Sequence, residues 1–199
     1  LEFTDLDLII HLAGKSRVRE SLNNPGDYWT TNVEGTRRIF ERFKKVKILY
    51  ASSSSAYEPT LNPYAASKFI MEQIAPPNSL GMRFHTVYSD TPRKGMFLDK
   101  LLKNKLEYVT NHKRDFIHIE DLCDAIELLF GKDLNGIIDI GTGISVKVQD
   151  LAPNVPIRLN TKNERLYTQA NIQTLRNLGF KPKYNIEKFL TNKNLGTII

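Results

Sequence analysis

Short apolar runs alternate with amphipathic stretches through the first 90 residues of the chain, and no other feature of the sequence constrains the fold as strongly. In the run 7–12 the apolar residues are adjacent, which is typical of a buried strand in a parallel sheet covered on both faces. The expected order is strand 7–12, helix 27–43, strand 47–51, helix 63–75 and strand 80–88. Strands and helices in this order predict a doubly wound α/β sheet.

After residue 90 the expected elements become shorter. We expect helices over 96–105 and 120–130, strands over 116–119 and 137–140, a weak strand over 156–159, a helix from about 171 that Gly179 closes, and a last helical turn near 186–190. Cys123 falls within the amphipathic helix 120–130, and we interpret it as a packing residue.

The composition excludes several classes of protein. With 41% hydrophobic and 25% charged residues the chain is neither disordered nor collagen-like, and its apolar runs are far shorter than the roughly 20 residues of a membrane helix. We therefore expect no membrane association. The single cysteine cannot form an internal disulfide and no export leader is visible, so we expect a cytoplasmic protein. The chain begins at Leu1 without an initiator methionine, which suggests that something upstream is missing.

The net charge of +6 comes from the C-terminal quarter. Residues 151–199 hold eight of the 28 basic residues and two of the 22 acidic ones, so residues 1–150 balance at 20 of each. This basic region allows three interpretations: a solvated surface, a site for an anionic ligand, or a nucleic-acid surface. Nucleic acid is disfavoured because no aromatic residues of the kind that stack on bases interleave with the charges.

Three short patterns fail as functional motifs. Gly14-Lys15-Ser16 resembles the end of a phosphate-binding loop, but the glycine required five residues before Gly14 is replaced by Ile9. Gly141-Thr142-Gly143 follows an expected strand, yet the third glycine of a dinucleotide fingerprint would fall at Val146. The four histidines lack metal-ligand spacing with one another or with the cysteine, so we expect no metal site.

Tyr64 and Lys68 form a more informative pair. Residues four apart share one face of a helix, so the ammonium can lie near the phenol, lower its pKa and make it a general base. The helix follows a strand that ends in the hydroxyl run 52–55, and open α/β sheets bind ligands beyond the carboxyl ends of their strands. We expect these side chains to converge on one cleft.

Six motifs occur in an order that resembles a known family. They are Asp7-Leu8-Ile9-Ile10-His11-Leu12-Ala13-Gly14, Asn32-Val33-Glu34-Gly35-Thr36, the 52–57 segment, Pro63-Tyr64-Ala65-Ala66-Ser67-Lys68, Met82-Arg83-Phe84, and Arg114-Asp115-Phe116-Ile117-His118-Ile119-Glu120-Asp121. In this order they resemble the extended short-chain dehydrogenase/reductases, and in particular the NAD-dependent nucleotide-sugar epimerase/dehydratase branch that includes UDP-glucose 4-epimerase. The resemblance implies a Rossmann-type parallel sheet that lacks its first strands, with a small C-terminal α+β region that caps the substrate. Residues 1–90 and 115–145 would form the C-terminal half of the cofactor domain, and 91–114 and 146–199 the substrate-binding region.

The resemblance also implies roles for individual residues. Tyr64, Lys68 and Ser53 would be catalytic, with Tyr64 as acid/base, Lys68 on the nicotinamide ribose and Ser53 on the reacting oxygen. Ala13, Gly14, Asn32, Tyr64 and Lys68 would bind the cofactor, and Ser54, Thr86 and Arg114 the substrate. The implied cofactor is NAD, with NADP left open, and the implied substrate is a nucleotide-diphosphate sugar. The helices over 32–43 and 64–75 would pack against a second subunit to form a homodimer.

Departures from the family pattern narrow the function. Dehydratases carry an Asp-Glu pair where this chain has Ser54 and Ser55, which favours a 4-epimerase that oxidises C4 transiently. The segment between Ser53 and Tyr64 is short, and Thr86 replaces an asparagine. The glycine-rich phosphate loop is not in the sequence, so we expect a fragment of an enzyme about 60 residues longer. Two alternatives stay open: a nucleotide-sugar reductase or dehydratase of the same fold, and a noncatalytic nucleotide- or RNA-binding relic.

Overall fold

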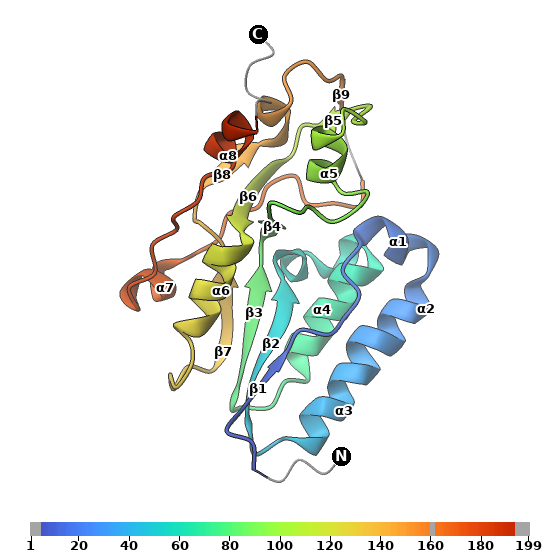
Figure 1. The fold of residues 1–199 in the computed structure, drawn as a ribbon. Helices are drawn as coiled ribbons and strands as arrows, with labels where there is room; N and C mark the ends of the chain where they lie inside the picture. The colour runs from blue at the N-terminus through green and yellow to red at the C-terminus, as the bar shows by residue number, and fades with distance from the viewer. Residues whose placement is uncertain (1–4, 160–161, 194–199) are drawn as a thin grey trace. The chain divides into compact units, whose positions relative to one another are not determined.

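The computed structural model describes residues 5–159 and 162–193, and their contacts group into two compact units. The first unit holds the described chain up to Phe84, with Gly131–Asp139 and Asn163–Arg165. The second unit holds His85–Phe130, the described residues from Ile140 to Lys162, and the chain from Leu166 onward. Figure 1 shows the elements of each unit by label.

The first unit is built on a sheet with the strand order β1-β2-β3-β7. Its strands are β1 (Leu8–His11), β2 (Lys47–Ser53), β3 (Ser79–Phe84) and β7 (Gly136–Ile140). The β1-β2 and β2-β3 pairs are parallel, with Leu49 opposite Leu80, and this confirms the predicted parallel α/β sheet. Ile48, Leu49 and Tyr50 of β2 are completely buried, as expected of a central strand covered on both faces.

The first strand differs from the prediction. β1 was expected to be buried, but Ile10 is 40% exposed and Leu12 beyond it is exposed as well. Within the part of the chain that the structure describes, β1 pairs with β2 alone, so it is an edge strand and its side chains are less covered.

The helices of the first unit fall close to the predicted ranges 27–43 and 63–75, except that the one over residues 18–23 was not predicted. They are α1 (Val18–Asn23), α2 (Pro25–Tyr28), α3 (Gly35–Arg42) and α4 (Pro63–Gln73), with 3-10 turns at Ser54–Tyr57 and Pro59–Leu61. The predicted helix 27–43 contains a π-helical turn, Trp29–Glu34, between α2 and α3, and π turns often occur at functional sites. α4 begins with Asn62, whose Oδ1 accepts a hydrogen bond from the Ala65 N–H at 2.8 Å.

The second unit contains two small sheets. β4 (Thr86–Tyr88) pairs in parallel with β6 (Lys113–His118), β6 pairs antiparallel with β8 (Ser145–Lys147), and β5 (Val109–Thr110) pairs with β9 (Ile157–Arg158). The helices are α5 (Phe97–Leu102), α6 (Ile119–Glu127), α7 (Gln173–Asn177) and α8 (Ile186–Asn192), with a 3-10 turn at Val148–Leu151. Tyr88, Phe116, Leu151 and Ile186 belong to its hydrophobic core.

Three local predictions require correction. The strand expected over 80–88 divides at His85, because β3 pairs with β2 whereas β4 pairs with β6 in another sheet. β2 continues through Ser53, two residues into the serine run. Cys123 is exposed, since α6 buries its opposite face through Leu122 and Ala125.

The two units do not coincide with the predicted cofactor and substrate regions. Residues 115–145 were expected to join the cofactor domain, but β6 and α6 group with β4, β8 and α8 in the second unit. Contacts define compactness and not which ligand each part binds, so the functional division stays a prediction.

Candidate active site

Tyr64 and Lys68 lie one turn apart on α4, and both are buried, with exposed fractions of 8% and 4%. The Lys68 Nζ donates a hydrogen bond to the main-chain oxygen of Ala51 in β2 at 2.7 Å. Burial of the ammonium lowers the pKa of Lys68 to about 8, although the Glu72 carboxylate opposes this change. Because the two residues are four positions apart on one helix, the predicted pair shares one face of α4, and Lys68 contacts β2 from it.

The loop after β1 brings Gly14 to the Lys68 ammonium. A Cβ at Gly14 would lie 3.4 Å from Lys68 Nζ and 3.0 Å from Asn32 Oδ1, so a side chain here would crowd both groups. Ala13 and Gly14 are themselves exposed. An open main-chain surface therefore lies beside a buried ammonium.

Asn32 fixes this loop from the π-helical turn. Its Oδ1 accepts a hydrogen bond from the Lys15 N–H at 2.8 Å, and its Nδ2 donates to the Lys15 oxygen at 3.0 Å and to Ser67 Oγ at 2.9 Å. Both amide hydrogens are thus used within the protein. These hydrogen bonds position the loop that carries Gly14, and the predicted contact of Asn32 with the cofactor stays a prediction.

Ser53 lies at the carboxyl end of β2 and begins the 3-10 turn Ser54–Tyr57. Its Oγ accepts a hydrogen bond from the Ser55 N–H at 3.1 Å, which leaves the hydroxyl hydrogen to be donated elsewhere. The Ser54 main-chain oxygen accepts from Arg165 Nη1 at 2.7 Å. Ser53 and Ser54 are both buried and belong, with Tyr64 and Lys68, to the first unit.

Sequence reasoning missed an aromatic residue held between two arginines. The Arg83 guanidinium lies 4.0 Å from the centre of the Tyr57 ring and that of Arg165 lies 5.0 Å from it. The Tyr57 hydroxyl contacts both carboxylate oxygens of Asp139 at 3.1 Å. Burial is the main cause that raises the pKa of Tyr57. No local pattern predicts this group, because Arg165 and Asp139 are far from Tyr57 in sequence.

A buried ion pair supports the same turn from the sheet side. Arg83 Nε and Nη2 donate to the two carboxylate oxygens of Glu72 at 2.8 and 2.7 Å, and Ser52 Oγ donates to one of them at 2.5 Å. Two-point contact of this kind fixes the orientation of the guanidinium. β2, β3 and α4 are thereby joined next to Ser53.

Thr86 and Arg114 belong to the second unit. Thr86 is in β4 opposite Phe116, and Arg114 is in β6, where its Nη1 donates to the Lys113 oxygen at 3.0 Å. They thus lie on neighbouring strands. The structure groups Ser53, Tyr64 and Lys68 in one unit and these two residues in the other.

The Gly141-Thr142-Gly143 loop holds an internal carboxylate. Asp115, fully buried, accepts hydrogen bonds from the Thr142 N–H at 2.8 Å, the Thr142 hydroxyl at 2.7 Å, the Gly143 N–H at 2.8 Å and the Ala170 N–H at 3.0 Å. Because these donors face Asp115, they are not available to a phosphate. The rejection of a dinucleotide fingerprint here is confirmed.

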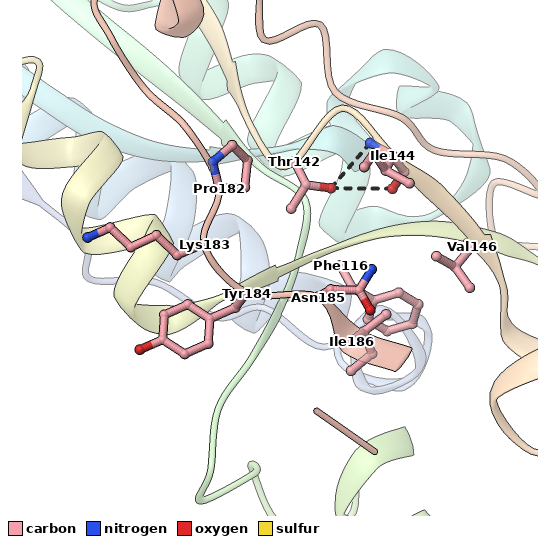
Figure 2. Close-up of a pocket in the computed structure, with 9 residues that line it drawn as sticks. All are labelled: Phe116, Thr142, Ile144, Val146, Pro182, Lys183, Tyr184, Asn185 and Ile186. Carbon is pink, nitrogen blue, oxygen red and sulfur yellow. Dashed lines mark hydrogen bonds between the residues drawn. The ribbon is translucent and has the colours of Figure 1, made fainter. Parts of the chain in front are cut away.

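A cavity of about 150 Å³ lies within the second unit (Figure 2). Its lining is mainly apolar, with Phe116, Ile144, Val146 and Ile186. The Lys183 ammonium, which pairs with Asp124 at 2.6 Å, points away from Phe116 in Figure 2. The cavity therefore offers little charge to a ligand.

Residues 5–159 and 162–193 lack two further features. Within them, no three His, Cys, Asp or Glu side chains are grouped so that they could hold a metal ion. Within the same residues, no helix combines the length and apolar character that crossing a bilayer requires.

The surroundings of Lys68 fit the ribose of a nicotinamide nucleotide. Ala51 takes one of the three hydrogen-bond donors of the ammonium, and the exposed Gly14 leaves room beside it for a ligand with paired hydroxyl groups. Tyr64 on the next turn of α4 adds a phenol to the same face. These residues can bind a diol and move a proton.

Comparison with known proteins gives consistent matches. Residues 1–141 match the model of the NAD dependent epimerase/dehydratase family. An uncharacterised protein of Methanocaldococcus jannaschii, MJ1055, is 31% identical, over 98% of this chain and 75% of its own length. The UDP-glucose 4-epimerase of Mycoplasma genitalium is 27% identical, over 77% of this chain and 62% of its own length.

Solved structures of other proteins have the same fold as this chain. The structure of MoeE5 in complex with UDP-glucose and NAD superposes with a TM-score of 0.79 at 25% identity, covering 94% of this chain and 78% of that one. The Rossmann-type fold and the family resemblance seen in the sequence are therefore both confirmed. With its parallel sheet, its buried Tyr64 and Lys68 and its match over residues 1–141, this chain belongs to the NAD dependent epimerase/dehydratase family.

Proposed function

We propose that this protein is an NAD-dependent UDP-sugar 4-epimerase. One observation carries the proposal: the buried Lys68 ammonium lies beside the open surface of Gly14, one helical turn from Tyr64. The matches to a UDP-glucose 4-epimerase and to a protein solved with UDP-glucose and NAD support this choice of substrate and cofactor.

In the proposed reaction Tyr64 takes the proton from the C4 hydroxyl of the sugar and later returns it. Ser53 donates its hydroxyl hydrogen to the same oxygen, because its own Oγ is already bonded to the Ser55 N–H. Lys68 binds the cofactor ribose, and its charge favours an anion on the nearby phenol. The chemistry supplied by bound NAD is reversible hydride acceptance at C4.

The carboxylates near the turn favour epimerisation over dehydration. Ser54 and Ser55 replace the Asp-Glu pair of dehydratases, and a serine hydroxyl is not a general acid or base near pH 7. Glu58, Glu72 and Asp139 lie close by, but each accepts hydrogen bonds from Arg165, Arg83 or Tyr57. None is therefore placed as a ready substitute for that pair.

The remaining parts of the proposal concern partners and location. Arg114 and Thr86 contact the nucleotide-diphosphate sugar, and Ala13 and Gly14 contact the cofactor. α3 and α4 form the interface of a homodimer, as the family resemblance implies. We infer a cytoplasmic location from the single, exposed cysteine.

The test is an assay of C4 epimers. The complete protein to which this chain belongs is incubated with NAD and UDP-glucose, UDP-galactose or their N-acetyl forms, and the products are separated. We expect one C4 pair to interconvert, and failure with all four sugars would contradict the proposal.

The matched variants are Tyr64→Phe and Tyr184→Phe. Tyr64→Phe keeps the ring, whose centre lies 6.2 Å from that of Tyr28 in an edge-on contact, so the variant should stay folded. Because it removes the proposed acid/base, turnover should fall by at least about a hundredfold. Tyr184→Phe, at an exposed tyrosine bonded to Glu120, should leave turnover unchanged. If Tyr64→Phe keeps its activity, Tyr64 has no part in the mechanism.

A further inference from the structure

Three consecutive residues from the C-terminal part of the chain belong to the first unit. Asn163, Glu164 and Arg165 each contact a different element of that unit, although Lys162 and Leu166 on either side group with the second. The Asn163 oxygen accepts a hydrogen bond from Asn62 Nδ2 at 2.9 Å, and Glu164 lies 3.5 Å from Arg19. Asn62 is the residue that caps α4 beside Tyr64.

Arg165 holds both ends of the 3-10 turn that follows Ser53. Its Nη1 donates to the Ser54 oxygen at 2.7 Å, and its Nε donates to Glu58 Oε1 at 2.8 Å. Between these contacts its guanidinium lies over the Tyr57 ring. The Arg165 side chain is 19% exposed and Ser54 is buried, so the hydrogen bond between them is stronger than one on an open surface, whereas Glu58 is half exposed.

We propose that Arg165 is a positioning residue for Ser53. The inference rests on the proposed function, since it assumes that the Ser53 hydroxyl acts on the substrate. Ser53 Oγ is oriented by the Ser55 N–H, and Ser55 lies inside the turn that Arg165 closes. Arg165 therefore fixes the direction of the Ser53 hydroxyl without touching the substrate.

The contact requires the shape of arginine. The planar guanidinium of arginine can donate to a carbonyl oxygen and to a carboxylate while it lies over an aromatic ring. A lysine ammonium is a single point charge and cannot make all three contacts at once. The contact of Arg83 with Tyr57 and the Arg83–Glu72 pair do not involve Arg165. Arg165→Gln should therefore loosen the turn without unfolding the first unit.

The first measurement is hydrogen exchange of the amides over 52–58, which requires no activity. Arg165→Gln should speed exchange of the Ser55 and Glu58 amides at least tenfold, because both donate inside the turn. The control is Arg19→Gln, which removes the partner of the adjacent Glu164 and should leave this exchange unchanged. Unchanged exchange in Arg165→Gln overturns the proposal, whatever its activity.

The second measurement is a double-mutant cycle on turnover. Arg165→Gln should lower kcat about 10- to 100-fold with KM for the UDP-sugar changed less than about threefold, the size expected for a misplaced catalytic group. Arg165→Lys should recover only part of the loss. In the Ser53→Ala background Arg165→Gln should cause almost no further loss, because Arg165 acts through Ser53.

The outcomes separate this inference from the proposed function. Additive losses in the cycle, or an unchanged kcat in Arg165→Gln, overturn the positioning role while the epimerase proposal stands. A wild-type protein with no epimerase activity overturns the proposed function and the role for Ser53 with it. Fast exchange together with a non-additive loss of kcat supports both.

Discussion

Replacing Lys68 by methionine should change how the stability of the first unit depends on pH. Burial disfavours the charged form of the Lys68 ammonium, so its pKa in the folded protein is about 8, whereas the ordinary value is 10.5. Between these two pH values the unfolded chain binds a proton that the folded protein has lost. Stability therefore rises with pH across this window, and the methionine variant lacks this rise.

The size of the effect follows from the difference between the two pKa values. At about 1.4 kcal/mol for each pH unit, it corresponds to about 3 kcal/mol. Below pH 8 both states carry the proton, so the wild type bears the whole cost of burying the charge. Above pH 10.5 both states are neutral and the cost is gone. The hydrogen bond to the Ala51 oxygen is lost in Lys68→Met at every pH, so it does not alter this dependence.

The assay is urea unfolding of wild type and Lys68→Met, followed by circular dichroism at several values from pH 7 to pH 10.5. The free energy of unfolding of the wild type, taken relative to the variant, should increase by about 3 kcal/mol over this range. Taking the difference removes the titration of other lysines and tyrosines. Lys45→Met, at an exposed lysine, should show a flat difference. A flat difference for Lys68→Met as well would refute the argument that burial depresses its pKa.

Two further substitutions test contacts inside each unit, Asp115→Asn in the second and Tyr50→Phe in the first. Asp115→Asn places an amide group against main-chain N–H donors that bond to a carboxylate in the wild type. The free energy of unfolding should fall by about 2 kcal/mol or more, and the midpoint of a thermal scan by roughly 5 °C. An unchanged midpoint would contradict the assigned hydrogen bonds. Tyr50→Phe removes a buried hydroxyl that finds no hydrogen-bond partner among the described residues, so it should stabilise the protein by about 1 kcal/mol in urea unfolding, and a loss of stability would show that the hydroxyl is bonded after all.

The order of strands and helices could be predicted because their burial patterns are local. β2 and α4 were predicted nearly to their ends, since Ile48-Leu49-Tyr50 is a continuous apolar run and Pro63 suits the first turn of a helix. Elements of two or three residues, such as β5 and β8, were missed. Two or three side chains are too few to show an alternation of apolar and polar residues. The division at His85 depends on which strand pairs with which, and the run 80–88 carries no mark of it.

Some features of the candidate site could also be predicted from the sequence, and others could not. Tyr64 and Lys68 could be assigned from the sequence because a helix repeats every 3.6 residues, so a spacing of four places them on one face. The hydrogen-bond partners of Asn32 could not be assigned in this way, because its amide bonds to Lys15 and Ser67, residues 17 and 35 positions away. The sequence also gave no sign that Asp115 accepts hydrogen bonds from the Gly141 loop, because the two segments are 27 positions apart.

The amino-acid sequence by itself determined the α/β class, the family and the pair on α4, since each depends on residues that are close in the chain. Only the tertiary structure decided that Arg165 and Asp139 meet Tyr57, and that a lysine ammonium lies buried beside Gly14. The physical reason is that hydrogen bonding and desolvation depend on distance in space. Chain folding alone sets that distance for residues more than 80 positions apart.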